Sequence, residues 1–187
     1  MTGSKVPHKI IHPKFTLVIG GARSGKSSFA EGLAKASSRP RRYIATAQAW
    51  DDEMQARIDQ HRDQRGGGWM TVEAPLDLKA ALADAQSGEV VLVDCATLWL
   101  SNQLLAEADL AAEAALLLAA VATCAAEVIV VSNEVGWSIV PDNPLARAFR
   151  DAQGRLNQEM AAQADLVVAV MAGLPIVLKG ILPVGTA

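Results

Sequence analysis

The residues best suited to chemistry lie near the start of the chain, in the sequence GGARSGKS at Gly20–Ser27. This sequence fits the pattern G-x-x-x-x-G-K-[ST], follows the apolar run Phe15–Ile19 and precedes a helical pattern over Lys26–Ala36, the context in which the pattern forms a phosphate loop. In such a loop, backbone N–H groups surround phosphate oxygens, and the lysine reaches the β and γ phosphates. The candidate phosphate-binding residues are Gly20, Gly21, Ala22, Arg23, Ser24, Gly25, Lys26 and Ser27.

A second acidic group is expected to serve the same ligand. Asp94 ends the hydrophobic run VVLVD, and an acid at the carboxyl end of a neighbouring strand often holds the metal in phosphate-loop proteins, in many cases through water. The Ser27 hydroxyl is the other expected metal ligand. The sequence therefore predicts a purine nucleoside triphosphate with Mg²⁺, GTP or ATP, and Ser27 and Asp94 as metal-binding residues.

His61 raises a separate question. If residues 51–65 form a helix, Met54, Ile58, His61 and Arg65 share one face, and the histidine could simply pack against the core or cap the helix. Alternatively, a neutral imidazole can attack a phosphorus atom and form a phosphoramidate. Arg62 and Arg65 could then stabilise the charge on the transferring and departing phosphates. Spacing alone leaves both interpretations open.

Composition limits the class of protein. The chain has 187 residues, 51% of them hydrophobic, and a formal net charge of −3, which suits one domain with a full core and argues against a surface for nucleic acid. The longest apolar run, Ala114–Ala126, is shorter than the about 20 residues that a membrane span needs. Cys95 and Cys124 lie in apolar stretches, as expected for reduced core thiols, so we expect a cytoplasmic protein without a membrane span.

Strand and helix patterns alternate along the chain. We expect strands at residues 15–19, 41–45, 69–75, 89–94, 127–134 and 165–173, and helices at residues 26–36, 51–65, 76–85, within 97–125 (two segments) and at 144–163. Alternation of this kind predicts an α/β fold, a mostly parallel sheet with helices on both faces. We expect a single P-loop NTPase-like domain at residues 15–187, preceded by a flexible arm at residues 1–14.

The chain resembles the bifunctional adenosylcobinamide kinase/adenosylcobinamide-phosphate guanylyltransferases of cobalamin synthesis. Besides the phosphate loop, the resemblance rests on YIATAQAWDDEMQARIDQHRDQR (43–65), W-x-T-x-E (69–73) and, loosely, residues 163–170. The most specific part is the string from Asn133 to Gln158, NEVG…IVP-x-N-x-LAR-x-FRD-x-x-G-x-x-NQ. Together these segments cover almost everything after residue 14.

The resemblance implies two linked reactions. The hydroxyl of adenosylcobinamide is phosphorylated, and GMP from GTP is then attached to that phosphate through a covalent histidine intermediate, giving adenosylcobinamide-GDP and pyrophosphate. It places the nucleophile at His61 and implies a homotrimer. It also implies guanine-nucleotide contacts at the phosphate loop and at Ala45, Thr46, Ala47, Arg62, Asp63, Gln64, Arg65, Glu73 and Asp94.

Some alternatives stay open from sequence. The chain could be a phosphate-loop kinase of another small alcohol with a structural His61, or a nucleotide-switched regulatory protein. Asn133 and Glu134, at the end of a predicted strand, either contact a ligand or form a turn and helix cap. Arginines in the last long helix either meet phosphates or form a solvated basic face. They are Arg147, Arg150 and Arg155.

Overall fold

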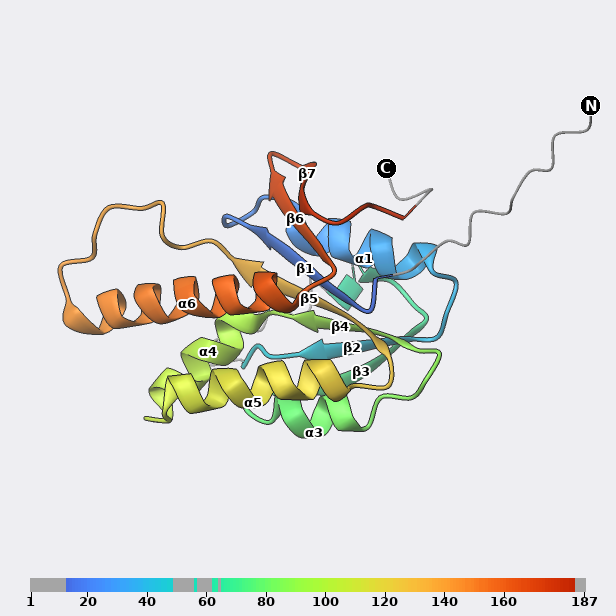
Figure 1. The fold of residues 1–187 in the computed structure, drawn as a ribbon, viewed down its shortest axis with the longest axis horizontal. Helices are drawn as coiled ribbons and strands as arrows, with labels where there is room; N and C mark the ends of the chain where they lie inside the picture. The colour runs from blue at the N-terminus through green and yellow to red at the C-terminus, as the bar shows by residue number, and fades with distance from the viewer. Residues whose placement is uncertain (1–12, 49–55, 57–61, 64, 184–187) are drawn as a thin grey trace, which may run out of the picture.

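The protein is a twisted sheet covered by helices on both faces (Figure 1). The computed structural model describes residues 13–48, 56, 62–63 and 65–183. The sheet has seven strands in the order β3-β2-β4-β5-β1-β6-β7, all parallel except β7, which runs antiparallel to β6. The strands are β1 (Phe15–Gly20), β2 (Arg41–Ala45), β3 (Trp69–Glu73), β4 (Val90–Asp94), β5 (Glu127–Asn133), β6 (Leu166–Met171) and β7 (Leu174–Lys179). The predicted α/β fold with a mostly parallel sheet is confirmed.

Local sequence signals explain where the helices begin. Asp77 and Asp109 accept hydrogen bonds from backbone N–H groups in the first turns of α3 and α5, and Asn143 does the same for α6, where Pro144 fits the first helical position. The helices are α1 (Lys26–Ala36), α3 (Leu78–Ala83), α4 (Ala96–Leu105), α5 (Leu110–Thr123) and α6 (Pro144–Gln163). Within the predicted helix at residues 51–65, the four described residues, Ala56, Arg62, Asp63 and Arg65, have helical backbone.

The sheet separates two apolar clusters. Helix α1 covers one face, where its Ala30, Leu33 and Ala34 pack with side chains of β1, β4, β5 and β6 (Figure 1). Helices α3, α4, α5 and α6 cover the other face, with Trp99, Leu117 and other large side chains in the larger cluster. The central strands are apolar on both sides because helices bury both faces, which explains their unbroken hydrophobic runs.

Strand β7 was not predicted. The last strand predicted from the sequence ends at residue 173, whereas Ala172 and Gly173 form a tight turn with positive φ angles, 51° and 80°, and the chain returns along β6. Every residue of β7 is exposed, including Leu174, Ile176, Val177 and Leu178. Pro175 argues against a strand in the sequence, because proline cannot donate a backbone hydrogen bond, but it is tolerated in a strand at the edge of a sheet.

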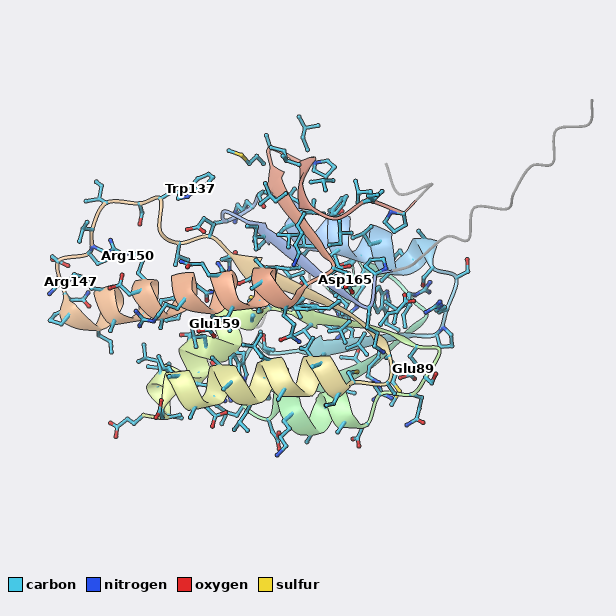
Figure 2. The ribbon with its side chains drawn as sticks, in the orientation of Figure 1. Glu89, Trp137, Arg147, Arg150, Glu159 and Asp165 are labelled. Atoms are coloured by element: carbon cyan, nitrogen blue, oxygen red, sulfur yellow. The ribbon has the colours of Figure 1, made fainter. Side chains whose placement is uncertain are left out.

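The amino end of the sheet is tied together by polar contacts. The backbone N–H groups of Lys14 and Phe15 donate to the Asp165 carboxylate, and the Lys14 ammonium donates to the carbonyls of Ala125 and Ala126. Figure 2 shows Asp165 next to the start of the sheet. Lys14, at the boundary of the predicted arm, is therefore bonded to the domain, and residues 1–12 lie outside the described part.

An ion pair between Arg42 and Glu89 also lies at the amino end of the sheet. The partly exposed Glu89 carboxylate (labelled in Figure 2) accepts from the buried Arg42 guanidinium at 3.1 Å and from the backbone N–H of Gln86 at 2.9 Å. Burial by itself would raise the pKa of Glu89, but these two donors outweigh it and hold the pKa below the ordinary value.

Among the residues that the structure describes, no helix is long and apolar enough to cross a membrane.

Candidate active site

The predicted strand, loop and helix around Gly20–Ser27 are all present. The loop turns through left-handed conformations at Arg23 (φ 56°) and Gly25 (φ 92°), and α1 begins at Lys26. The Lys26 ammonium donates to the Gly21 carbonyl at 3.2 Å, and the lysine side chain is largely buried. This loop has the form that exposes backbone N–H groups to an anion at a helix N-terminus, and Lys26 lies beside it.

The turn between β6 and β7 supports the loop from the opposite side. The Gly173 N–H donates to the Ser24 carbonyl at 2.9 Å. A Cβ on Gly25 would lie 3.2 Å from the Gly173 Cα, and one on Gly20 would lie 2.5 Å from the Val170 carbonyl oxygen. Close backbone packing therefore excludes a side chain at Gly20, and the positive φ of Gly25 together with this tighter contact favours glycine there.

Asp94 lies at the carboxyl end of β4, as predicted, and accepts a hydrogen bond from the Tyr43 hydroxyl at 3.2 Å. Burial raises the pKa of Tyr43 well above its ordinary range, and the Asp94 charge raises it further, so the phenol stays protonated and remains a donor. The hydroxyl of Ser27 and the carboxylate of Asp94 supply oxygen ligands, which Mg²⁺ prefers, and phosphates or water would complete its coordination. These two residues fit the predicted metal.

The strand ends beside Asp94 bring three other predicted residues together. Ala45 pairs with Asp94 on one side and with Glu73 on the other, so the carboxyl ends of β4, β2 and β3 meet here. Glu73 is exposed. Ala47, two residues beyond the end of β2, is partly exposed. The residues of these strands that are predicted to contact the nucleotide therefore lie together at the carboxyl ends of the strands.

Thr46 is placed differently from its neighbours. Its side chain is fully buried, and its hydroxyl donates to the Cys95 carbonyl and accepts from the Cys95 N–H, both at 2.8 Å. The Asn102 amide donates to the Thr46 carbonyl at 2.9 Å. The Thr46 hydroxyl thus fixes the backbone that follows Asp94. Burial and the Asp94 charge raise the pKa of the Cys95 thiol to about 11, so this thiol stays protonated at neutral pH.

Arg65 anchors the end of its segment on the sheet. Its guanidinium lies 3.5 Å from the centre of the Tyr43 ring and donates to the Thr71 hydroxyl at 3.1 Å. Trp69 packs edge-to-face on Tyr43 at 5.9 Å. Arg65 is only 6% exposed, and its Nε has no hydrogen-bond partner among the described residues. The Arg65 side chain, for which a nucleotide contact is predicted, is therefore already held by an aromatic ring.

Two predicted residues of this segment, His61 and Gln64, lie outside the described residues. Arg62 and Asp63 are described and are both exposed. The predicted nucleophile at His61 and the nucleotide contacts of residues 62–65 stay predictions. The segment does lead into Arg65, whose stacking on Tyr43 connects it to the hydrogen bond with Asp94.

The arginines at the start of α6 have local partners. Arg147 donates to the carbonyls of Pro141 and Asp142 at 2.9 and 2.6 Å, and Arg150 pairs with Asp151 at 3.4 Å. Figure 2 shows both arginines at the end of α6 that projects from the domain. Arg147 therefore braces the loop that precedes α6, whereas Arg150 pairs within the helix. Trp137, on the same loop, is 79% exposed and is not a core residue.

Sequence reasoning missed Tyr43, Thr97 and the buried polar side chains next to Asn133, which are Ser132, Gln153 and Asn157. Tyr43 reads as an ordinary strand residue, and its contact with Asp94 depends on the pairing of β2 with β4, which no local pattern reveals. Its place two residues before Ala45, on the same face of the strand, was the only available signal.

Comparison with known proteins places these features in a family. The model for cobinamide kinase / cobinamide phosphate guanyltransferase (CobU) matches residues 16–178. The bifunctional adenosylcobalamin biosynthesis protein CobP of Pseudomonas aeruginosa is 46% identical over 167 residues, covering 88% of this chain and 96% of that protein. The corresponding CobU proteins of Escherichia coli and Salmonella typhimurium are 44% and 43% identical, each covering 87% of this chain and 98% of the relative. The resemblance found in the sequence is confirmed, and the chain belongs to the cobinamide kinase / cobinamide phosphate guanyltransferase family.

Proposed function

We propose that this chain phosphorylates the hydroxyl of adenosylcobinamide with ATP or GTP and then transfers GMP from GTP to the new phosphate. The observation that carries the proposal is the phosphate loop with Lys26 at its helix, in a chain whose family match spans residues 16–178. Both reactions begin from a nucleoside triphosphate, so one loop can serve both.

In the first reaction, the substrate hydroxyl attacks the γ-phosphorus, the bond to the β-phosphate oxygen breaks, and the hydroxyl proton is lost. Charge grows on the terminal phosphate oxygens and on the departing diphosphate. Lys26 and the loop N–H groups stabilise this charge from fixed positions, which is the main contribution a protein makes to phosphoryl transfer. Ser27 and Asp94 would hold Mg²⁺, which would supply positive charge to the same phosphate oxygens.

In the second reaction, we propose that a ring nitrogen of His61 attacks the α-phosphorus of GTP and pyrophosphate leaves. The phosphate of adenosylcobinamide phosphate then attacks the guanylyl phosphorus, the P–N bond breaks, and the imidazole is regenerated. Two in-line steps replace one difficult displacement. Support comes from the family resemblance at residues 43–65 and from Arg65, which holds the end of that segment on β2.

Further parts of the proposal follow from the family resemblance. The guanine nucleotide would contact the strand ends at Ala45, Thr46, Ala47, Glu73 and Asp94 and the segment 62–65. A homotrimer in the cytoplasm is the proposed state. The exposed apolar strand β7, at an open edge of the sheet, is a feature that favours contact with another chain.

The test is guanylylation of the protein itself. The full chain is incubated with Mg²⁺ and GTP labelled at the α-phosphorus, then denatured, and bound label is measured. We expect label that is labile to acid and stable to alkali, as a phosphoramidate is, and its loss in His61→Ala. Transfer of γ-phosphate from labelled ATP to adenosylcobinamide tests the first reaction.

The chain offers matched controls in its other two histidines, His8 and His12. The variants His8→Ala and His12→Ala are expected to retain the label. Label that persists in His61→Ala would show that another residue is the nucleophile. Absence of label from the wild type, with γ-phosphate transfer intact, would reduce the proposal to a kinase.

A further inference from the structure

Asn133, the last residue of β5, is held by side chains from two helices. Its N–H donates to the Thr97 hydroxyl of α4 at 2.7 Å, and its carbonyl accepts from the Asn157 amide of α6 at 3.1 Å. A strand end usually needs no such support, because its backbone groups can bond to water. The backbone of Asn133 is therefore fixed on both sides by the protein.

Behind these contacts lies a buried polar network. Ser132 Oγ donates to Asn157 Oδ1 at 2.6 Å, and the Gln153 amide donates to both of these oxygens at 2.9 Å. The hydroxyl oxygens of Thr97 and Ser132 are 3.4 Å apart, within hydrogen-bond distance. Gln153 is fully buried, and its Oε1 has no hydrogen-bond partner among the described residues. Polar groups buried in this way cost free energy relative to apolar packing, but they fix a single geometry.

The geometry that the network fixes is that of a residue beside the phosphate loop. Asn133 pairs with Gly20, the first residue of the loop, and the next N–H, that of Glu134, donates to the Gly20 carbonyl at 3.0 Å. In the sheet order, β5 lies between β1, which leads into the loop, and β4, which ends at Asp94. Asn133 therefore lies between the phosphate loop and the proposed metal-binding acid.

The Asn133 side chain is left without a strong partner. Among the residues that the structure describes, its Nδ2 contacts only the Cys95 sulfur, at 4.0 Å, a weak acceptor at long range. The proposal for Asn133 therefore depends on its place next to Gly20 and on the weak partner of its amide.

We propose that Asn133 is a further catalytic residue of the kinase reaction, whose Nδ2 donates a hydrogen bond to an oxygen of the terminal phosphate. Thr97, Asn157 and Gln153 are its positioning residues. The inference rests on the proposed function. The amide neither gains nor loses a proton. It offers a fixed dipole to oxygens whose charge changes as the γ-phosphoryl group moves, and the weak sulfur contact is exchanged for a charge-assisted one.

The test compares Asn133→Ala and Asn133→Asp with the wild type in transfer of γ-phosphate from ATP to adenosylcobinamide. Removing one donor of this kind lowers kcat by about 100-fold or more. Asn133→Asp is expected to lower it further, because the carboxylate repels phosphate. Asn143→Asp is the matched control. It adds the same charge within ten residues, and its oxygen can still cap α6, so its activity is expected to equal that of the wild type.

Gln153→Met tests the positioning role, since methionine has similar volume and cannot hold Ser132 and Asn157 through hydrogen bonds. We expect a kcat below that of the wild type with an unchanged KM for ATP. Combined with Asn133→Ala, it is expected to cause no further loss of kcat, because its effect passes through the missing amide. A merely structural Gln153 would give additive losses.

Guanylylation from α-labelled GTP separates the possible failures. Asn133→Ala is expected to retain it, because the terminal phosphate is not the reacting group in that step. Equal loss of both activities, or an unchanged kinase kcat, would overturn the role of Asn133. If Asn133→Asp does not fold, Asn133→Ser preserves the backbone contacts and is measured instead. A wild type without either activity would overturn the proposed function itself.

Discussion

The Arg65 guanidinium lies 3.5 Å from the centre of the Tyr43 ring, and the hydroxyl of that ring donates to Asp94. One buried aromatic side chain thus joins the end of the segment that carries the proposed nucleophile to the proposed metal-binding acid. Arg65 and Tyr43 are both buried, so the contact is shielded from water. A cation and an aromatic ring attract each other more strongly at such a buried site than at an exposed one.

Arg65→Lys is expected to lower the free energy of unfolding by about 1–2 kcal/mol, because lysine cannot stack its planar group on Tyr43 while bonding to Thr71. Urea denaturation measures the change. The control is Arg62→Lys at an exposed position of the same segment, expected to change stability by less than about 0.5 kcal/mol. Equal effects of the two substitutions would show that the stacked contact contributes nothing.

Lys26→Ala is expected to weaken both the kinase reaction and guanylylation, because both place a triphosphate on the same loop. Loss of one charged contact to the transition state lowers kcat/KM by about 100-fold or more. The control is Lys35→Ala, on the same helix, where the exposed lysine pairs with the buried Glu31 at 3.4 Å. Normal guanylylation in Lys26→Ala would contradict a shared phosphate site.

The two glycines that open the loop are expected to differ in their tolerance of alanine. In Gly20→Ala, the new Cβ meets the Val170 carbonyl at 2.5 Å, so the backbone must move and the free energy of unfolding falls by about 1–3 kcal/mol. In Gly21→Ala, the Cβ meets no atom of the described residues within 4 Å, apart from those of its chain neighbours, and stability is expected to stay nearly constant. Thermal or urea unfolding of both variants measures the difference, and a stable Gly20→Ala would show that β6 does not confine the loop.

The Arg42–Glu89 pair predicts how stability depends on pH. Because the folded-state pKa of Glu89 is lowered, its contribution is present above the ordinary glutamate pKa and is lost as pH falls through the folded value. Glu89→Gln is therefore expected to lower stability at neutral pH and to flatten its decline in acid. Unfolding curves from about pH 7 to pH 3 measure both effects. An acid limb as steep as that of the wild type would contradict the assignment.

The sequence was sufficient for the parts of the site that depend on local order. GGARSGKS between a strand and a helix predicts the phosphate loop, and unbroken apolar runs predict the central parallel strands, with Asp94 at a carboxyl end. These patterns work because the backbone conformation of a loop, and the burial of a strand on both faces, depend on neighbouring residues.

Other features depend on contacts between segments far apart in the chain. The Tyr43–Asp94 hydrogen bond joins residues separated by 51 positions, and the Gln153–Ser132 bond requires α6 to pack on β5. The Thr46 hydroxyl is bonded to the Cys95 backbone, because the register of β2 against β4 brings the two together. No periodicity within one segment specifies such pairings.

The hairpin of β6 and β7 has one further consequence. Its turn donates to the Ser24 carbonyl, while its outer strand leaves an apolar edge open at the end of the sheet. A polypeptide that extended the sheet along this edge would pair with β7, and so would contact the same hairpin that supports the phosphate loop. Quaternary contact at β7 and tertiary support of Ser24 would then share a single structural unit.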